Sequence, residues 1–314
     1  MQIYRRIDDL NLGLKDAIVT LGNFDGIHLG HQALIRNAVE DAQRRDMMSL
    51  VLTFEPHPLK VLAPGRAPQM LLAHKDKLQL MQSLGVDYLV IQQFDLAFAA
   101  IPAEEFVRTV LANRLKARKV WVGKDLRFGK GRAGDIDTLK SWGAQCGFDV
   151  GIVDPILVDD KRVSSSRIRQ LISEGRVDEV QPMLGRYHFV SGRVVGGHRR
   201  GRELGFPTAN ISTKTEVIPR DGIYATLVHL GEKQLLSVSS VGLNPTFGEG
   251  PRTIESFILD FTDEIYGKAV RLSFIKRIRE ERKFTSVEEL SAQIDRDVSS
   301  AEAIFQDLKL SAQV

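Results

Sequence analysis

A run of ten residues, GNFDGIHLGH at 22–31, constrains the fold of this chain more than any other feature. The segment before it, 17–21, is apolar and β-branched, which predicts a buried parallel strand. The segment after it has one apolar helical face, formed by Leu34, Ile35, Ala38, Val39 and Ala42. A strand that turns through glycine into a helix directs the helix N–H groups, and the positive end of the helix dipole, at whatever lies above the sheet.

Two histidines, His28 and His31, close this run about one helical turn apart, so both can face one anion. That arrangement indicates a site for a nucleotide α-phosphate. The run matches neither common phosphate loop, because it contains no G-x-x-x-x-G-K-[ST] and no G-x-G-x-x-G. The histidine pair alone also fits two core histidines or half of a metal site, whereas the complete H-x-G-H after an Asp-Gly turn is more specific.

The amino-acid composition limits the classes of protein to which this chain can belong. The 314 residues, 43% hydrophobic and 26% charged, fit a soluble globular chain of one large domain or two ordinary ones. A net charge of +3 gives no argument for nucleic acid. The single cysteine, Cys146, excludes an intrachain disulfide and fits a reducing compartment. Without a signal-like N-terminus or an apolar stretch of roughly 20 residues, we expect a cytoplasmic protein.

Up to about residue 181 the pattern alternates between strands and helices. Strands are expected at 17–21, 49–54, 87–91, 119–122 and 148–153, and helices at 74–83, 102–115 and 166–174. In the helix at 102–115, the apolar residues in register are Phe106, Val110, Leu111 and Leu115. This alternation predicts a Rossmann-like α/β domain, with a parallel sheet, helices on both faces and ligands at the carboxyl ends of the strands.

Beyond residue 187 the segments are mostly extended and punctuated by glycine and proline. Strands are expected at 187–195, 223–230, 235–241, 253–261 and 270–278, which predicts an antiparallel sheet or barrel. A closing amphipathic helix begins with two capping patterns, Thr285 with Glu288 and Ser286 with Glu289. Its apolar stripe is Val287, Leu290, Ile294, Val298, Ala301 and Phe305. We place the domains at 1–184 and 185–314.

Three more segments of the first half suit a phosphate or a ring. FEPHP at 54–58 follows the second strand, and the glycine-rich basic loop GKDLRFGKGRAG at 123–134 follows the fourth. SSSRIR at 164–169 opens a helix whose serine caps leave N–H groups for phosphate, while Arg169 could clamp a triphosphate. Taken singly, each also fits an ordinary loop or a capped surface helix.

The segment GGHRRGRELGFPTANI at 196–211 concentrates the chemistry of the second half. Thr208 and Asn210 are two apart on an extended stretch, so they face the same way. Two neutral oxygen ligands side by side suggest a partial Mg²⁺ site that phosphates and water complete. The segment fits equally a basic hairpin followed by a strand, or the loop of an RNA-binding barrel.

Glu255 lies on the strand expected at 253–261, where alternation places it on one face with Phe257, Leu259 and Phe261. Burial among them would raise its pKa and suit it to act as a general base. Periodicity also allows a solvated position at a barrel mouth. The turn NPTF at 244–247 could hold a substrate.

The H-x-G-H run resembles the signature of nucleotidyltransferases, and the first half resembles the adenylyltransferase half of bacterial bifunctional riboflavin kinase/FMN adenylyltransferases. The matching residues are Gly22 to Gly26, His28, Gly30, His31, Phe54 to Pro58, Gly123, Asp125, Arg127 to Gly129, Ser164, Ser165, and Arg167 to Arg169. Leu126 stands where phenylalanine is usual and Ser166 where threonine is usual; the first removes an aromatic face that could stack on a flavin.

For the first half the resemblance implies that His28, His31 and Arg169 stabilise the α-phosphate under attack, without a covalent enzyme intermediate. It further implies nucleotide binding by Gly22, Asn23, Phe24, Asp25, Gly30, Ser164, Ser165 and Arg167. The flavin would be bound by Phe54, His57, Pro58, Asp125 and Phe128.

The second half resembles the riboflavin kinase domain of the same family, in the segments 201–211, 221–225, 241–248, 254–261 and 266–267. This resemblance implies that Thr208 and Asn210 hold magnesium-ATP and that Glu255 deprotonates the ribityl 5′-hydroxyl. Nucleotide binding is implied for Gly197, Arg202, Gly205 and Pro207, and flavin binding for Asn244.

We therefore expect two successive reactions. Riboflavin and ATP give FMN and ADP, and FMN with a second ATP gives FAD and pyrophosphate, with Mg²⁺ as the cofactor that accompanies ATP. We expect no nucleic-acid or membrane partner, and a monomer or weak homo-oligomer.

Overall fold

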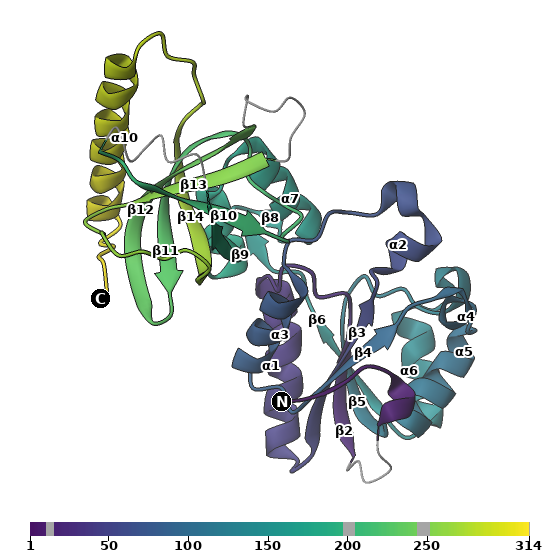
Figure 1. Cartoon of the computed structure of the whole chain (residues 1–314). Helices are drawn as coiled ribbons and strands as arrows, with labels where there is room; N and C mark the ends of the chain where they lie inside the picture. Colours follow the sequence, from purple (N-terminus) through teal and green to yellow (C-terminus); the bar gives the residue numbers. More distant parts are fainter. Residues whose placement is uncertain (11–15, 197–204, 244–251, 314) are drawn as a thin grey trace. The chain divides into compact units, whose positions relative to one another are not determined.

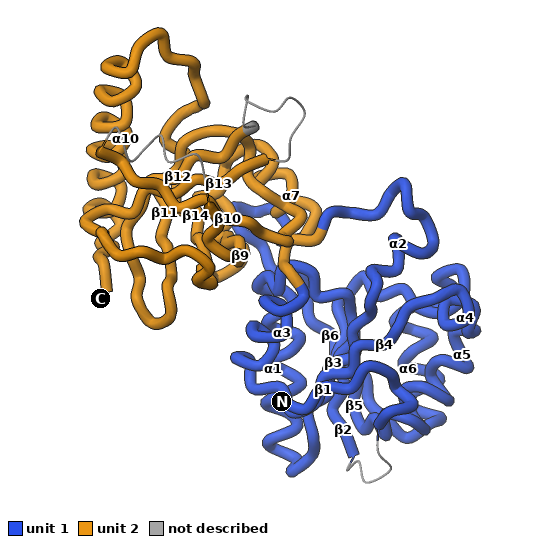
Figure 2. The backbone as a smooth tube through the Cα atoms, viewed as in Figure 1, with its two compact units in different colours: residues 1–69, 74–164 blue, residues 70–73, 165–314 orange. Residues whose placement is uncertain are grey.

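The computed structural model describes residues 1–10, 16–196, 205–243 and 252–313, and the chain divides into two compact units (Figure 2). Unit 1 comprises Met1–Gln69 and His74–Ser164, and unit 2 comprises Met70–Ala73 and Ser165–Val314. Each unit has its own hydrophobic core and is described by itself.

Unit 1 is built on a six-stranded sheet in the order β1-β4-β3-β2-β5-β6, in which every neighbouring pair is parallel. Its strands are β1 (Gln2–Tyr4), β2 (Ala17–Leu21), β3 (Met48–Glu55), β4 (Tyr88–Gln93), β5 (Ala117–Gly123) and β6 (Asp149–Val153). The chain leaves β2 toward β3 on one side and later returns to β5 on the other. The sheet therefore has its topological switch point beside β2, where α/β sheets bind ligands. The predicted parallel sheet is confirmed.

Helices cover both faces of this sheet (Figure 1): α1 (Leu29–Arg44) and α3 (His74–Ser83) lie on one side, and α4 (Leu96–Ala99), α5 (Ala103–Glu105) and α6 (Ile136–Gln145) lie on the other. The remaining elements are η1 (Ile7–Asp9), α2 (Pro58–Leu62), η2 (Pro64–Arg66), η3 (Phe106–Arg114), η4 (Lys130–Arg132) and the hairpin of β7 (Leu157–Val158) with β8 (Lys161–Arg162). The helix predicted at 102–115 becomes α5 followed by the π-helical η3. There, for example, the N–H of Leu115 donates to the carbonyl of Val110, five residues back.

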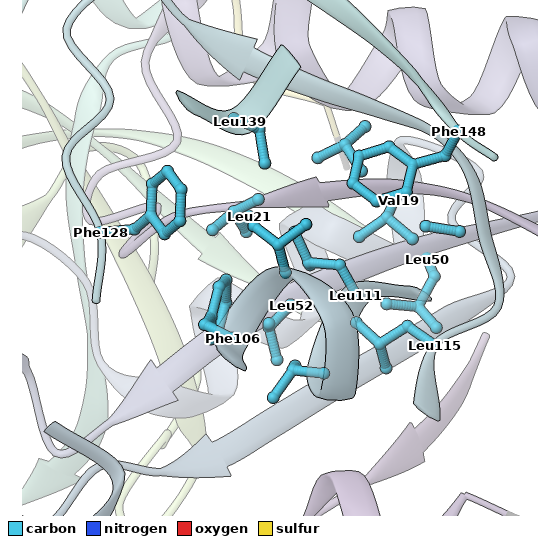
Figure 3. Close-up of a cluster of buried hydrophobic side chains, with 14 of the residues drawn as sticks. Val19, Leu21, Leu50, Leu52, Phe106, Leu111, Leu115, Phe128, Leu139 and Phe148 are labelled. Carbon is cyan, nitrogen blue, oxygen red and sulfur yellow. The ribbon is translucent and has the colours of Figure 1, made fainter. Parts of the chain in front are cut away.

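The core of unit 1 fills one side of the sheet (Figure 3). Val19 and Leu21 of β2 and Leu50 and Leu52 of β3 lie with Phe106, Leu111, Leu115, Phe128, Leu139 and Phe148, all of them buried. On the opposite side, α1 buries the face predicted for it, Leu34, Ile35, Ala38, Val39 and Ala42.

A buried carboxylate fastens α1 to β5. Asp41 accepts hydrogen bonds from Trp121 Nε1 at 2.8 Å, Lys119 Nζ at 2.7 Å and Arg44 at 2.6 Å. Burial alone would raise the pKa of Asp41, but these donors outweigh it and hold the pKa at about 2. These contacts fix α1, whose amino end carries the two histidines, against β5.

Unit 2 is a closed barrel of six antiparallel strands in the order β10-β13-β12-β11-β14-β9, as the sequence predicts. The strands are β9 (His188–Val195), β10 (Thr208–Thr213), β11 (Gly222–Leu230), β12 (Lys233–Leu243), β13 (Arg252–Ile258) and β14 (Ala269–Arg279). The helices are α7 (Ser165–Glu174), η5 (Asp178–Val180), α8 (Gln181–Leu184) and α10 (Val287–Asp307).

Helix α10 closes one outer face of the barrel, where Ala301 and Phe305 are buried against Ala225, Leu227 and Ile275 (Figure 1). Of the two predicted capping patterns, the second is the N-cap: the Ser286 hydroxyl accepts from the N–H of Glu289 at 3.1 Å. The strands differ from prediction in two ways. β1 and the β7–β8 hairpin were not predicted because each strand has only two or three residues. β13 ends at Ile258 rather than 261, and Asp260 then takes a left-handed φ of 51°.

Candidate active sites

The turn between β2 and α1 places His28 and His31 ring against ring. His28 caps α1, since its Nδ1 accepts the backbone N–H of His31 at 3.3 Å. The two ring centroids are 3.7 Å apart with an interplanar angle of 16°. Gly30 allows this stack, because a Cβ at that position would lie 3.2 Å from Cε1 of His28. Both imidazoles therefore stand at the amino end of a helix, where an anion is favoured.

The protonation of His31 is set by its surroundings. Burial, the neighbouring His28 and the positive charge of Lys77 together lower the pKa of His31 well below its ordinary value. His31 is therefore a neutral imidazole at neutral pH, able to donate one ring N–H. Lys77 of α3 was not found from the sequence, because a single lysine in a helix with several charges carries no pattern.

A cavity of about 240 Å³ opens beside the histidines. Its walls bring together the start of α1, the loop after β5, the segment 153–156 after β6, and Ser164. Asp125, in the loop after β5, forms an ion pair with Arg162 at the cavity wall. The structure thus unites three predicted pieces, His28 and His31 with Gly30, Asp125, and Ser164, around one space.

Two phenylalanines predicted to bind flavin, Phe54 and Phe128, belong to one row of ring contacts. Phe54 at the end of β3 lies 5.8 Å, centroid to centroid, from both Phe94 and Phe98. Phe98 continues the row to Phe106 at 6.2 Å, and Phe106 to Phe128 at 5.8 Å. Phe54 is half-buried, whereas Phe128 is buried in the core. Phe128 therefore packs in the core of unit 1, at the buried end of this row.

The segment FEPHP at 54–58 contacts the turn at 22–28, between β2 and α1. His57 Nε2 and the Asn23 side-chain nitrogen are 3.1 Å apart, and His57 also caps α2, whose first residue is Pro58. Phe24 and Asp25 are both buried, and Phe24 meets the ring of His31 edge-on at 5.3 Å. The predicted residues Gly22 to Asp25 thus form the support of the histidine pair.

The remaining predicted residues of the first half, Ser165, Arg167 and Arg169, lie on α7, which packs in unit 2. Ser165 is its first residue, one position before the start of the helix expected at 166–174.

In unit 2 the barrel register brings the predicted metal ligands to the predicted base. Asn210 of β10 is paired directly with Glu255 of β13, and Thr208 with Phe257. Directly opposed residues share a face, so Thr208, Asn210 and Glu255 all point the same way. The Thr208 hydroxyl donates to Oε2 of Glu255 at 3.4 Å.

The face that carries Glu255 is not the core face of β13. The buried residues of that strand are Ile254, Ser256 and Ile258, which face the barrel interior, whereas Glu255 and Phe257 are half-buried on the other side. The prediction that Glu255 shares a face with Phe257 is correct, but that face is not the interior, because apolar residues occur on both faces of this strand. Phe206 covers it by packing edge-on against Phe257 at 5.3 Å.

A cavity of about 310 Å³ lies at the start of β10. Thr208 and Pro207 line it on one side, Ser256 and Ile258 on another, and residues 261–266 close it. Within 261–266, the sequence predictions include Phe261, at the end of the strand expected at 253–261, and Tyr266, as part of the resemblance. Gly205, also predicted to bind nucleotide, adopts a positive φ of 84° just before Pro207.

Glu281 is a second carboxylate that the sequence analysis missed. Ser240, paired with Glu255 across β12 and β13, donates to Oε1 of Glu281 at 3.2 Å. Burial raises the pKa of Glu281, and the nearby charges of Asp221 and Glu255 act in the same direction. The predicted residues Gly197, Arg202 and Asn244 lie outside the described residues.

The donors in unit 2 suit magnesium. A hydroxyl, an amide and a carboxylate are hard oxygen ligands, and one or two protein oxygens with substrate phosphates are what Mg²⁺ takes in phosphotransferases. In the part of the chain that the structure describes, no group of three or more histidine, cysteine, aspartate or glutamate side chains could hold a metal. The hydroxyl of Thr208 and the amide of Asn210 fit a metal that a nucleotide carries in.

These two sites and folds define a two-domain transferase that uses nucleotides. Comparison with known proteins agrees: the FAD synthetase family model matches residues 12–167 and the riboflavin kinase family model matches residues 184–305. The bifunctional riboflavin kinase/FMN adenylyltransferase of Escherichia coli (strain K12) is 36% identical over 97% of this chain and 98% of its own length. That of Haemophilus influenzae is 34% identical over 97% and 99%. The chain belongs to the family of bifunctional riboflavin kinase/FMN adenylyltransferases.

A solved structure has the same fold along nearly the whole chain. The crystal structure described as a macrolide-efflux protein from Streptococcus pneumoniae superposes with a TM-score of 0.87 at 32% identity, covering 96% of this chain and 98% of that one. Among the described residues of the present chain, no helix is long and apolar enough to cross a membrane.

Proposed function

We propose that the two units of this bifunctional riboflavin kinase and FMN adenylyltransferase each carry one of its two activities. FMN adenylylation is assigned to the histidine site of unit 1, and riboflavin phosphorylation to the Thr208–Glu255 site of unit 2. The observation that carries the assignment is that each unit has its own cavity, lined by His28 and His31 in unit 1 and by Thr208 in unit 2. The boundary that we propose from the sequence, 1–184 for the adenylyltransferase and 185–314 for the kinase, leaves α7 and α8 in the adenylyltransferase sequence, although both helices pack in unit 2.

In the kinase step, Glu255 accepts the proton of the ribityl 5′-hydroxyl, and the 5′-oxygen of riboflavin attacks the γ-phosphorus of ATP. The bond from that phosphorus to the bridging oxygen breaks, and ADP leaves. Thr208 and Asn210 would hold Mg²⁺ with the ATP phosphates; the metal neutralises the charge that develops on them. The 310 Å³ cavity beside Thr208 would receive the nucleoside part of ATP. Most of the rate gain comes from positioning and electrostatics.

In the adenylyl step, the phosphate of FMN attacks the α-phosphorus of a second ATP and pyrophosphate leaves. The attacking group is already an anion, so no protein base is needed. His28, His31 and the amino end of α1 stabilise the negative charge on the α-phosphate, in the cavity that Ser164 also lines. Phe54 would face the flavin ring. The roles of Ser165, Arg167 and Arg169 remain predictions from the sequence.

The test is to incubate the full chain with riboflavin, ATP and Mg²⁺ and to separate the flavins over time. FMN should appear first and FAD later. A chain that makes FAD only from added FMN would have a barrel without kinase activity, and a chain that makes neither would refute both assignments. We further propose that it acts in the cytoplasm, supported by its single, half-buried cysteine, as a monomer or weak homo-oligomer.

A further inference from the structure

Lys77 of α3 contacts the carbonyl of Asn23, in the turn at 22–28 between β2 and α1. Its Nζ donates to the carbonyl oxygen of Asn23 at 2.7 Å and to Oγ1 of Thr53 at 2.8 Å. The Thr53 hydroxyl, on β3, donates to the same carbonyl at 3.3 Å. Side chains from a helix and a strand thus converge on one backbone atom of the turn that leads to His28 and His31.

The turn needs such support because its backbone is strained. Phe24 and Ile27 have φ values of 48° and 39°, a region that bulky and β-branched residues rarely adopt. Phe24 is completely buried and contacts His31 edge-on. A displacement of the Asn23 carbonyl would therefore move Phe24, and Phe24 would move the ring of His31.

Charged groups face Lys77 from each of these elements. Burial lowers the pKa of Lys77 to about 8, while Asp25 of the turn and Glu55 of β3 act in the opposite direction. On the side of α1, the charge of Lys77 helps to lower the pKa of His31, together with burial and His28. The ammonium group thus lies between two carboxylates and the histidine pair.

We propose that Lys77 is a positioning residue of the adenylyl transfer, which fixes the Asn23 carbonyl and, through Phe24, the ring of His31. Lys77 does not touch the reacting atoms; it acts through the turn. The proposal rests on the assignment of adenylyl transfer to unit 1.

The test compares Lys77→Met, Lys77→Arg and the matched control Lys75→Met, an exposed lysine of the same helix. FAD formation from supplied FMN and ATP is measured in the full chain from about pH 6 to about pH 9.5, and riboflavin phosphorylation reports folding. We expect Lys77→Met to lower kcat/KM for ATP by about tenfold to a hundredfold. Lys77→Arg should recover most of this loss at pH 7, and Lys75→Met should match the unaltered protein.

The pH profile and the His31 titration separate positioning from plain stability. The unaltered protein should lose activity above a pH of about 8, as Lys77 deprotonates, and in Lys77→Arg this loss should move to higher pH. NMR titration should show a raised pKa of His31 in Lys77→Met but not in Lys75→Met. An unchanged kcat/KM in Lys77→Met would overturn the proposal. If Lys77→Met does not fold, the proposal is overturned when Lys77→Arg loses activity at the same high pH as the unaltered protein.

A separate experiment checks the site itself: His28→Ala and His31→Ala should both lose FAD formation. If both variants still form FAD at the normal rate, the assignment of adenylyl transfer to unit 1 fails instead.

Discussion

The hydroxyl of Thr208 donates to the carboxylate of Glu255 at 3.4 Å across the pair of strands β10 and β13. The register of a closed barrel fixes this contact, because neither strand can slip without reversing every side chain in the interior. A group suited to hold a nucleotide-borne metal and a group suited to accept a proton are therefore held side by side before substrates bind.

Glu255→Gln tests the role of the carboxylate. The amide keeps the shape but cannot take the 5′-hydroxyl proton, so FMN formation should fall by about a hundredfold or more. Adenylylation of supplied FMN should stay normal, as should both activities of the control Glu232→Gln, an exposed residue of the β11–β12 turn. A fully active kinase would reduce Glu255 to a structural role.

His28→Ala tests the histidine pair. It removes one donor to the α-phosphate and also the cap of α1, so FAD formation should fall by about a hundredfold, corresponding to about 3 kcal/mol of transition-state stabilisation. Riboflavin phosphorylation, measured in the same sample, should be near normal. An equal fall of both activities in a folded variant would contradict the division of labour.

Gly30→Ala tests the stacked geometry without removing a functional group. The new methyl would lie 3.2 Å from Cε1 and 3.3 Å from Nδ1 of His28 and should push the ring off the stack. We expect FAD formation to fall several-fold with unchanged unfolding temperature and kinase activity. Gly65→Ala is the control, since nothing lies within 4 Å of a methyl there. Full adenylyltransferase activity in Gly30→Ala would show that ring stacking is not needed.

Sequence patterns located most of the fold and the separate pieces of both sites. Alternation found the strands β2 to β6, and the H-x-G-H run placed His28 and His31 at the start of α1. Tertiary contacts that leave no local pattern were missed. Lys77 is remote from Asn23 in sequence, and Glu281 reaches Ser240 from beyond the end of β14. The outward direction of Glu255 was also undetermined, because apolar side chains lie on both faces of its strand.

His188 gives the barrel a pH-dependent stability. It is buried at the start of β9 against Phe274, and burial, then Arg186, lower its pKa to about 3. The unfolded chain binds a proton at this residue below a pH of about 6.5, and the folded barrel does not. The free energy of unfolding should therefore fall by about 2 kcal/mol between about pH 7.5 and about pH 5.

Denaturant unfolding of the unaltered protein and of His188→Phe, at both pH values, measures this effect. The variant keeps a ring beside Phe274 but cannot take up the proton, so its pH dependence should be smaller by that amount. Equal pH dependence in the two proteins would show that His188 is not the source.

The most direct measurement of the central claim mixes two variants of the full chain, each inactive in one of the two reactions. His28→Ala and Glu255→Gln are each incubated with riboflavin, ATP and Mg²⁺, alone and together, and FAD is quantified. If each unit performs its own reaction, neither variant alone makes appreciable FAD. The mixture should make it, because FMN from the first variant is adenylylated by the second. A mixture of folded variants that makes FMN but no FAD would contradict the account, since the second variant would then lack the adenylyltransferase activity assigned to its intact unit 1.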